Sequence, residues 1–220
     1  QFTPHDSWDF DANAEMILTD LVVGGRMRKV LVTFNKNGFA YTLDRATGEL
    51  LVAEPFAHVT WAKGIDKRTG TPILDTSKVT GASRGNVTGI CPSLEGGKSP
   101  VSASAFSPRT KLFYTATNNL CMNFEATQVT RIPATPFIGA TTPYVAGPGG
   151  YMGAFIAWDA ARARKVWEVK EQFPVWSGTV VTGGDIAFYG TLDGWFKAVD
   201  IQTGKVVWKF KVGSGVVRAL

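Results

Sequence analysis

One short phrase recurs along this chain and limits the folds that the chain can adopt. The phrase is an apolar residue, Asp, two variable residues and Thr-Gly, and complete copies stand at residues 43–48, 65–70 and 199–204. A degenerate copy at residues 158–163 keeps the Asp but lacks Thr-Gly. Gly153 precedes Gly194 by about 41 residues, the length of one blade of a propeller. The sequence therefore predicts a repeat of such blades.

Strand and turn signals around the phrase support an all-β fold. Residues 186–191, 195–199 and 206–210 are rich in β-branched and aromatic side chains, and Asp193-Gly194 is typical of a hairpin turn. Asn37-Gly38 predicts the same turn between two further apolar runs. These patterns predict antiparallel meanders with almost no helix.

Composition excludes several classes of protein. The chain is 45% hydrophobic and 19% charged, enough to bury a sizeable core, and no apolar run approaches the roughly 18 residues of a membrane span. The net charge of +5 comes from basic residues scattered beside strand-like positions, without a continuous basic stripe. We therefore predict no transmembrane segment and no nucleic-acid partner, whereas attraction to an acidic redox partner stays open.

The two ends of the chain do not resemble the ends of a protein. Residues 1–3 have no initiator Met and no signal-peptide pattern, and residues 212–220 supply no capping element. We expect residues 1–220 to be one partial domain, truncated at both ends, and we expect this piece alone to be inactive.

Two acidic residues near the start are the first candidate site. Asp9 and Asp11 stand at i and i+2, so in an extended segment they lie on one side, about 6–7 Å apart. Both carboxylates can then converge on one cation, and one of them can serve as a base. The alternative is a solvated turn in which the acids cap backbone groups.

The cysteines and histidines do not form a recognisable metal motif. Cys91 and Cys121 are too far apart for a local metal knuckle, so they are either a disulfide or two buried thiols. A disulfide would add roughly 3–4 kcal/mol to stability and would indicate an oxidising compartment. His5 and His58 are interpreted as structural or solvent-facing.

The repeat resembles a motif of one enzyme family. The run Ala198-x-Asp-x-x-Thr-Gly-Lys-x-x-Trp208 is similar to the tryptophan-docking motif of the quinoprotein dehydrogenase propellers. In that family the tryptophan packs against a peptide of the next blade. Trp167 fits this pattern, whereas Val52 and Leu74 at the matching places do not. The resemblance implies an eight-bladed propeller, of which this chain covers roughly half the blades.

The acidic segment carries a second resemblance. Pro4-His5-Asp6-x-Trp8-Asp9-Phe10 is similar to the segment with the catalytic aspartate of methanol and ethanol dehydrogenases that depend on pyrroloquinoline quinone (PQQ). This implies that Asp9 is the general base and a metal ligand. Calcium-dependent members carry Ala, Ser or Thr at the place of Asp11, whereas lanthanide-dependent members carry Asp. A second hard carboxylate suits a trivalent ion, so Asp11 implies a lanthanide.

The resemblance also implies contacts to the cofactor and a disulfide. Lys36, in Asn35-Lys36-Asn37-Gly38, matches the basic residue that reaches the PQQ carbonyls. Trp176 matches a tryptophan of the cofactor pocket, with core packing as the alternative. Ser99 stands where family members often carry a quinone-binding Asn, and it can make only one such hydrogen bond. Cys91 and Cys121 match a structural disulfide of the methanol dehydrogenases.

The family therefore implies a function for the whole protein. It implies a periplasmic quinoprotein that oxidises methanol or another short primary alcohol to the aldehyde with PQQ and a lanthanide ion. Electrons would pass to cytochrome c, and the protein would form a homodimer. The alternatives are a calcium-dependent PQQ ethanol dehydrogenase and a non-catalytic propeller scaffold with the same repeats. The family's remaining metal ligands, a Glu and an Asn, have no counterpart in this chain.

Overall fold

A computed structural model describes residues 1–81, 83–135 and 139–218 of the chain. Its elements, in chain order, are β1 (Ile17–Val23), β2 (Arg26–Phe34), β3 (Phe39–Asp44), β4 (Leu50–Pro55), β5 (Ala62–Asp66), β6 (Thr71–Leu74), the 3-10 helix η1 (Thr76–Lys78), β7 (Val87–Ile90), β8 (Ala105–Ser107), β9 (Leu112–Asn118), β10 (Leu120–Ala126), β11 (Ala140–Thr141), β12 (Tyr144–Ala146), β13 (Gly153–Asp159), β14 (Arg164–Glu171), β15 (Val180–Val181), β16 (Ile186–Gly190), β17 (Trp195–Asp200) and β18 (Val206–Lys211). No helix among the described residues is long and apolar enough to cross a membrane.

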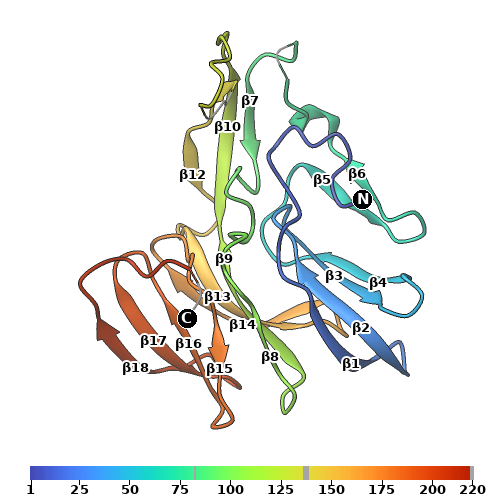
Figure 1. Ribbon diagram of the computed structural model, residues 1–220, viewed down its shortest axis with the longest axis vertical. Coiled ribbons are helices and arrows are strands. Elements are labelled where there is room, and N and C mark those ends of the chain that lie inside the picture. Colours follow the sequence, from blue (N-terminus) through green and yellow to red (C-terminus); the bar gives the residue numbers. More distant parts are fainter. Residues whose placement is uncertain (82, 136–138, 219–220) are drawn as a thin grey trace.

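Three four-stranded antiparallel sheets form the blades. Their strand orders are β1-β2-β3-β4, β14-β13-β9-β8 and β15-β16-β17-β18. In Figure 1 the first strands β1, β8 and β15 lie near the middle of the lower half, while β4 and β18 lie at its right and left edges. This arrangement confirms the predicted all-β propeller architecture. Within the part of the chain that the structure describes, three sheets have this blade form.

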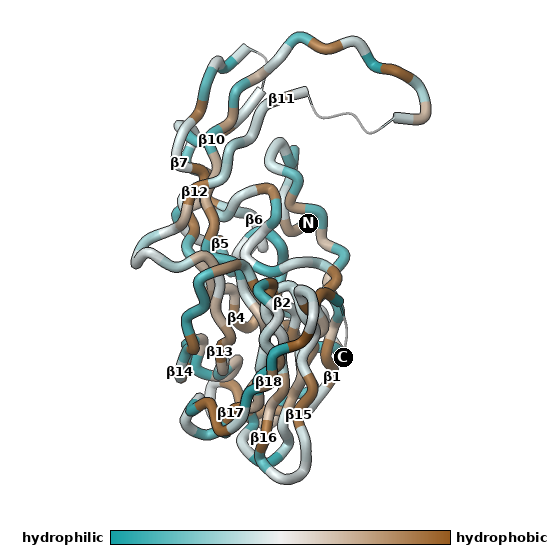
Figure 2. Tube along the Cα trace, turned by 90° about the vertical axis from the view of Figure 1, so that its left-hand side faces the viewer, coloured by the Kyte–Doolittle hydropathy of each residue, from teal (hydrophilic) through white to brown (hydrophobic). Residues whose placement is uncertain are grey.

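A long insertion separates the second and third strands of the middle blade. Between β9 and β13, strands β10, β11 and β12 form a separate sheet with β7. In the side view of Figure 2, β7, β10 and β11 extend above the blades. The second copy of the repeated phrase connects β5 and β6, a two-stranded hairpin outside the three blades. The phrase therefore marks a turn and not always a blade.

Three of the four copies of the repeated phrase fold into one turn with one set of contacts. Asp200 Oδ1 accepts hydrogen bonds from the amides of Gln202 (3.0 Å) and Thr203 (2.8 Å), as Asp44 does from the two matching amides of its own turn. The degenerate copy keeps the same pair of bonds to Asp159. There Ala163 takes a φ of 56° at the position where the complete copies have glycine. The Asp therefore forms the turn without Thr-Gly.

Trp167 joins the middle blade to the last one. Its Nε1 donates to the carbonyl oxygen of Ile201 at 3.1 Å, and a Cβ on Gly204 would lie 2.8 Å from the indole ring. This confirms the predicted packing of Trp167 on the neighbouring blade. Trp208 lies on β18, where it is 48% exposed, so its docking role stays a prediction.

We expect replacement of Trp167 by Ala to lower the free energy of unfolding by about 3 kcal/mol, because it removes the indole from the contact between two blades. Trp167→Phe keeps a ring but loses the hydrogen bond to Ile201, and should cost about 1 kcal/mol. Denaturant titration of the protein measures both values. A loss below about 1 kcal/mol for the Ala variant would contradict the docking role.

Candidate functional site

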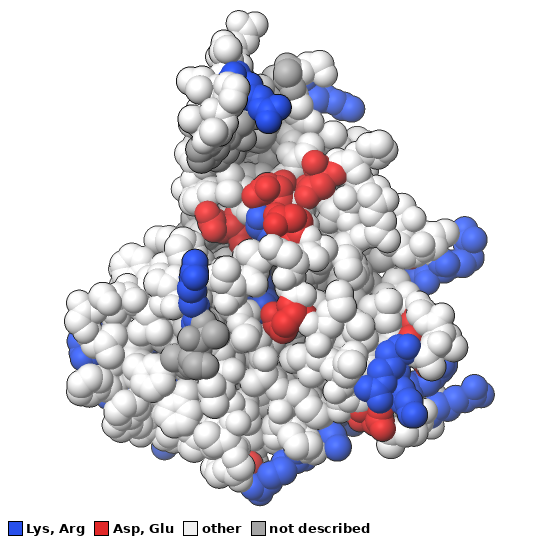
Figure 3. Space-filling model, in the orientation of Figure 1, with Lys and Arg blue, Asp and Glu red and all other residues white. Residues whose placement is uncertain are grey.

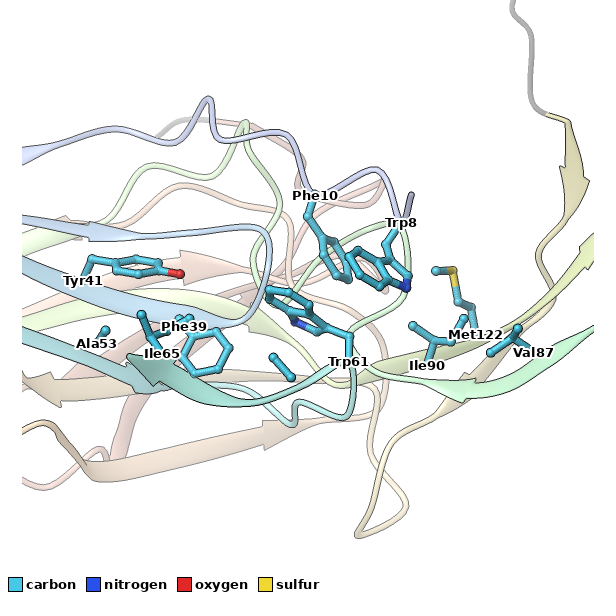
Figure 4. Close-up of a cluster of buried hydrophobic side chains, with 11 residues drawn as sticks. Trp8, Phe10, Phe39, Tyr41, Ala53, Trp61, Ile65, Val87, Ile90 and Met122 are labelled. Atoms are coloured by element: carbon cyan, nitrogen blue, oxygen red, sulfur yellow. The ribbon is translucent and has the colours of Figure 1, made fainter. Parts of the chain in front are cut away.

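Aromatic packing holds the N-terminal segment and turns Asp9 outward. Trp8 and Phe10 are 2% and 1% exposed, their rings stack at 5.8 Å, and both contact Trp61 in the cluster drawn in Figure 4. The indole of Trp8 also donates to the carbonyl oxygen of Lys78 at 2.7 Å. Asp9, between these anchors, adopts a φ of 69°, a left-handed conformation that Asp tolerates better than most residues. Its carboxylate is thereby presented at the surface.

The β2–β3 hairpin positions Lys36 through its asparagines. The side-chain oxygen of Asn35 accepts from the amide of Asn37 at 3.0 Å, and that of Asn37 accepts from the amide of Phe39 at 3.1 Å. Trp61 Nε1 donates to the Asn37 carbonyl at 2.8 Å. The turn is fixed on both sides, and the Lys36 side chain is only 8% exposed.

Lys36 brings the two predicted acids together. Its Nζ lies 2.9 Å from Asp9 Oδ2 and 2.9 Å from Asp11 Oδ1, while the two acid side chains remain 65% and 55% exposed. In Figure 3 acidic side chains gather at the centre of the face, around a basic group that is largely covered. The convergence expected from the i, i+2 spacing is present, with an ammonium group between the carboxylates.

Lys36 and Asp11 stay charged over a wide pH range. Burial acts to lower the pKa of Lys36, but the hydrogen bonds to Asp11 and Asp9 and their charges outweigh it and leave this pKa raised. The hydrogen bond from Lys36 lowers the pKa of Asp11. The stabilisation from Asp11 is present above the ordinary carboxyl pKa and is lost only as pH falls through the lowered value. That from Lys36 is present below the ordinary lysine pKa and is lost only as pH rises through the raised value.

The loop at Gly96 and Gly97 packs against Lys36, and at both positions a side chain larger than that of glycine would clash with neighbouring atoms. The amide of Gly97 donates to the Lys36 carbonyl at 2.8 Å. A Cβ on Gly96 would lie 2.2 Å from Lys36 Cγ, and one on Gly97 would lie 2.8 Å from Ala57 Cβ. The Gly-Gly pair therefore lets this loop approach the backbone of the hairpin turn.

We expect Gly96→Ala to break the pairing of Lys36 with the two acids, because the added methyl group occupies the space of Cγ. The raised pKa of Lys36 should then fall, which increases the fraction of reactive free amine. Acylation of Lys36, followed by peptide mass spectrometry, should therefore be faster in this variant than in the wild type. Gly24→Ala is the matched control, since Gly24 also has a positive φ (59°) but has nothing within 4 Å of its Cβ position. Equal rates in both variants would contradict this role of Gly96.

A buried ion pair beside this loop was not predicted. Lys98 is 0% exposed at its side chain, and its Nζ lies 2.8 Å from Glu15 Oε2. Glu15 Oε1 accepts from the amide of Ser104 at 2.8 Å. Burial acts to raise the pKa of Glu15, but the charge of Lys98 and these hydrogen bonds leave that pKa lowered. The pairing joins residues far apart in the chain, so no local sequence pattern could have indicated it.

The structure does not join the other two predicted cofactor contacts to the acid cluster. Ser99 is 6% exposed, and its carbonyl accepts from the amide of Ser102 at 3.1 Å. Trp176 is half-buried, and its Nε1 is a buried donor without an acceptor among the described residues. Within the described part of the chain, no hydrogen bond links either residue to Asp9, Asp11 or Lys36. The unpaired indole N–H suits a contact to a ligand.

Cys91 and Cys121 are disulfide-bonded, which resolves the alternative left open by the sequence. The exposed His58 lies close to them, with all three potential ligand atoms within 4.8 Å of one another. Because both sulfurs are in the disulfide, they are not available as thiolate ligands. Among the residues that the structure describes, no group of three or more potential metal-binding side chains includes Asp9 or Asp11.

Asp9 and Asp11 nevertheless fit part of the ligand set of a hard cation. Each carboxylate is more than half exposed and uses only one oxygen for Lys36, which leaves Asp9 Oδ1 and Asp11 Oδ2 for a metal. Two carboxylates against one ammonium leave a net negative charge. Hard cations of this kind take six or more oxygen ligands, so the pair supplies a minority of them.

An apolar pocket of ≈ 270 Å³ opens beside Asp9. Its walls include Trp8 from the N-terminal segment and Leu94, Met122 and Phe124 from the region of the disulfide. A carboxylate at the edge of an apolar pocket suits a small molecule with a hydroxyl group and a short carbon chain.

Comparison with known proteins agrees with this fold. A family model described as the β-propeller domain of glucose/ethanol/alcohol dehydrogenases, of the PQQ type, matches residues 1–59. The lanthanide-dependent methanol dehydrogenase of Methylacidiphilum fumariolicum is 52% identical over 220 residues, covering 99% of this chain and 36% of that protein. The enzyme of the same name from Methylorubrum extorquens is 49% identical over 228 residues, covering 99% and 38%. A solved structure of a europium-containing methanol dehydrogenase superposes with a TM-score of 0.94 at 50% identity, over 100% of this chain and 38% of the other.

The propeller sheets and the matched family model make this chain similar to the quinoprotein propellers. Within that class, it resembles the PQQ-dependent methanol and alcohol dehydrogenases over nearly its whole length. It spans between a third and two fifths of the length of these relatives.

Proposed function

We propose that this chain is part of the propeller of a PQQ-dependent alcohol dehydrogenase that uses a lanthanide ion and oxidises methanol or another short primary alcohol to the aldehyde. The observation that carries the proposal is the convergence of Asp9 and Asp11 at Lys36. It occurs in a chain about half identical to two lanthanide-dependent methanol dehydrogenases. Residues 1–220 would form one partial domain of that enzyme.

Three residues of this chain have separate roles in the proposed alcohol oxidation. Bound PQQ would supply the acceptor for the hydride of the alcohol, and a bound metal ion would supply positive charge beside it. Asp9 is the proton acceptor for the alcohol hydroxyl, because its exposed carboxylate borders the apolar pocket. Lys36 orients that carboxylate and supplies a fixed positive charge that stabilises negative charge on a nearby oxygen. Asp11 holds the ion together with Asp9.

Two further residues of this chain would contact the cofactor. Trp176 would donate from its unpaired Nε1, and Ser99 would offer its single hydroxyl. Both assignments rest on the family resemblance and on the burial of these side chains.

Compartment and partners follow from the same resemblance. The Cys91–Cys121 disulfide suits an oxidising compartment, so we place the enzyme in the periplasm. Electrons would pass to a cytochrome c, and the net charge of +5 suits an acidic redox partner. A homodimer is the proposed assembly.

A calcium-dependent ethanol dehydrogenase is the second candidate. Lys36 favours it, because Lys stands at this place in several alcohol dehydrogenases whereas many methanol dehydrogenases carry Arg. Asp11 opposes it, because a second carboxylate suits a trivalent ion better than a divalent one.

The enzyme proposal is tested by methanol-dependent reduction of an artificial dye. The full-length protein that contains this chain is purified, loaded with PQQ and lanthanum, and assayed with methanol and ethanol. We expect turnover that requires PQQ. No turnover with any primary alcohol would contradict the proposal and would favour a non-catalytic propeller scaffold.

A further inference from the structure

We propose that Glu15 and Lys98 are positioning residues for the acid cluster formed by Asp9, Asp11 and Lys36. Their buried ion pair ties the segment that carries the acids to the loop that supports Lys36. The inference rests on the proposed function, since it concerns how Asp9 and Asp11 are presented to a metal ion.

Glu15 anchors the acid-bearing segment at three points. Its carboxylate accepts from Lys98 Nζ at 2.8 Å and from the amide of Ser104 at 2.8 Å, and its carbonyl accepts from Thr33 Oγ1 at 3.0 Å. Ser104 directly precedes β8, the first strand of the middle blade, and Thr33 belongs to β2. A residue outside any strand is therefore attached to two blades.

The ammonium group of Lys98 is buried in its ion pair with Glu15. The Lys98 side chain is fully buried, and the ammonium group has Glu15 as its charged partner, whose side chain is 29% exposed. A buried charge that loses its partner is strongly unfavourable. The pair therefore holds residue 15 and residue 98 at a fixed separation.

The loop that carries Lys98 also carries the support of Lys36. Gly97, the preceding residue, donates its amide to the Lys36 carbonyl at 2.8 Å and accepts from the amide of Asn118 at 2.8 Å. Gly96 packs directly against the Lys36 side chain. Any movement of residue 98 is thus transmitted to the backbone of residue 36.

These contacts close a ring through the site. Asp11 accepts a hydrogen bond from Lys36, and the Lys36 carbonyl accepts one from the amide of Gly97. Lys98 follows Gly97 in the chain and forms the ion pair with Glu15. The segment from residue 15 back to residue 11 completes the ring. The segment between Phe10 and β1 has no regular secondary structure. Without the ion pair, Asp11 would keep its bond to Lys36 but lose the constraint on its own backbone. Binding of an ion that needs both carboxylates would then weaken.

A second buried ion pair provides a matched control. Lys197 Nζ lies 2.7 Å and 2.8 Å from the two carboxylate oxygens of Glu171, and the side chains are 15% and 10% exposed. This pair also joins two blades, through β14 and β17. No hydrogen bond among the described residues connects it to the acid cluster. Its loss should cost stability alone.

The test compares ion affinity with stability in the full-length protein. Terbium luminescence titration gives the affinity of a trivalent ion, and thermal unfolding gives the stability, for wild type, Glu15→Gln and the control Glu171→Gln. We expect both variants to unfold at lower temperature, and only Glu15→Gln to bind terbium about tenfold or more weakly. Lys98→Met is the second variant, since it leaves the partly exposed Glu15 hydrated, and it should show the same selective loss.

The outcomes separate this inference from the proposed function. Equal terbium affinity in wild type, Glu15→Gln and Lys98→Met would overturn the positioning role and leave the proposed function intact. An equal loss of affinity in Glu171→Gln would also overturn it, because the effect would then be one of stability. A wild type that binds no terbium would overturn the proposed metal site and this inference with it.

Discussion

Replacing Asp9 by Asn is expected to lower kcat for methanol about 10²- to 10⁴-fold, the usual contribution of a positioned general base. Asn tolerates the left-handed φ of 69° at this position, and Trp8 and Phe10 keep the segment anchored on either side. The amide oxygen of Asn can still accept the hydrogen bond of Lys36 and still offer an oxygen to the ion, so the variant removes the basicity and one negative charge. Steady-state kinetics at saturating methanol measure the effect, and thermal unfolding checks that the fold is retained.

Asp20→Asn is the control for this prediction. Asp20 is an exposed acid on β1, with a side chain 56% exposed and a surface ion pair to Arg45 at 3.4 Å. Its replacement should leave kcat unchanged, because exposed pairs of this kind contribute little. An Asp9→Asn enzyme that kept more than about a tenth of the wild-type rate would remove Asp9 from the role of base.

Replacing Asp11 by Ala is expected to weaken binding of a trivalent ion by about 10²-fold or more. The change removes one hard oxygen ligand and neutralises one of the two carboxylates that face Lys36. A unit charge about 4 Å from another is worth about 4 kcal/mol near a protein surface, and the ion carries three charges. Terbium luminescence titration measures the affinity, and lanthanum-dependent methanol oxidation measures its consequence.

Asp11→Asn separates charge from ligand number, because the amide retains one oxygen donor at the same position. We expect its affinity to fall between those of the wild type and Asp11→Ala. An Asp11→Ala enzyme with full lanthanum-dependent activity would show that the second carboxylate does not select the ion.

The blades could be predicted from sequence because their turns are determined locally. An Asp that accepts from two following amides needs only neighbouring residues, so the phrase at residues 199–204 and even its degenerate copy at residues 158–163 reveal the turns. The insertion of β10, β11 and β12 between β9 and β13 could not be predicted in this way. Pairings in that sheet are long-range, and the hydrophobic pattern does not say which strands are neighbours in space.

The candidate site likewise has a part that the local sequence indicates and a part that depends on long-range contacts. The spacing of Asp9 and Asp11 indicates their convergence, and the resemblance points to Lys36 as a third member. The ion pair of Glu15 with Lys98 depends on contacts between distant segments, so nothing near either residue indicates it. The sequence likewise could not show that the Trp176 indole lacks an acceptor, because burial and partners are properties of the folded chain.

The central claim is that the paired carboxylates of Asp9 and Asp11 make this a lanthanide site within a PQQ propeller. The most direct test is methanol oxidation by the full-length apoprotein, reconstituted with PQQ and with either lanthanum or calcium. We predict turnover with lanthanum and little or none with calcium at equal metal occupancy. Equal rates with calcium and lanthanum would contradict the claim.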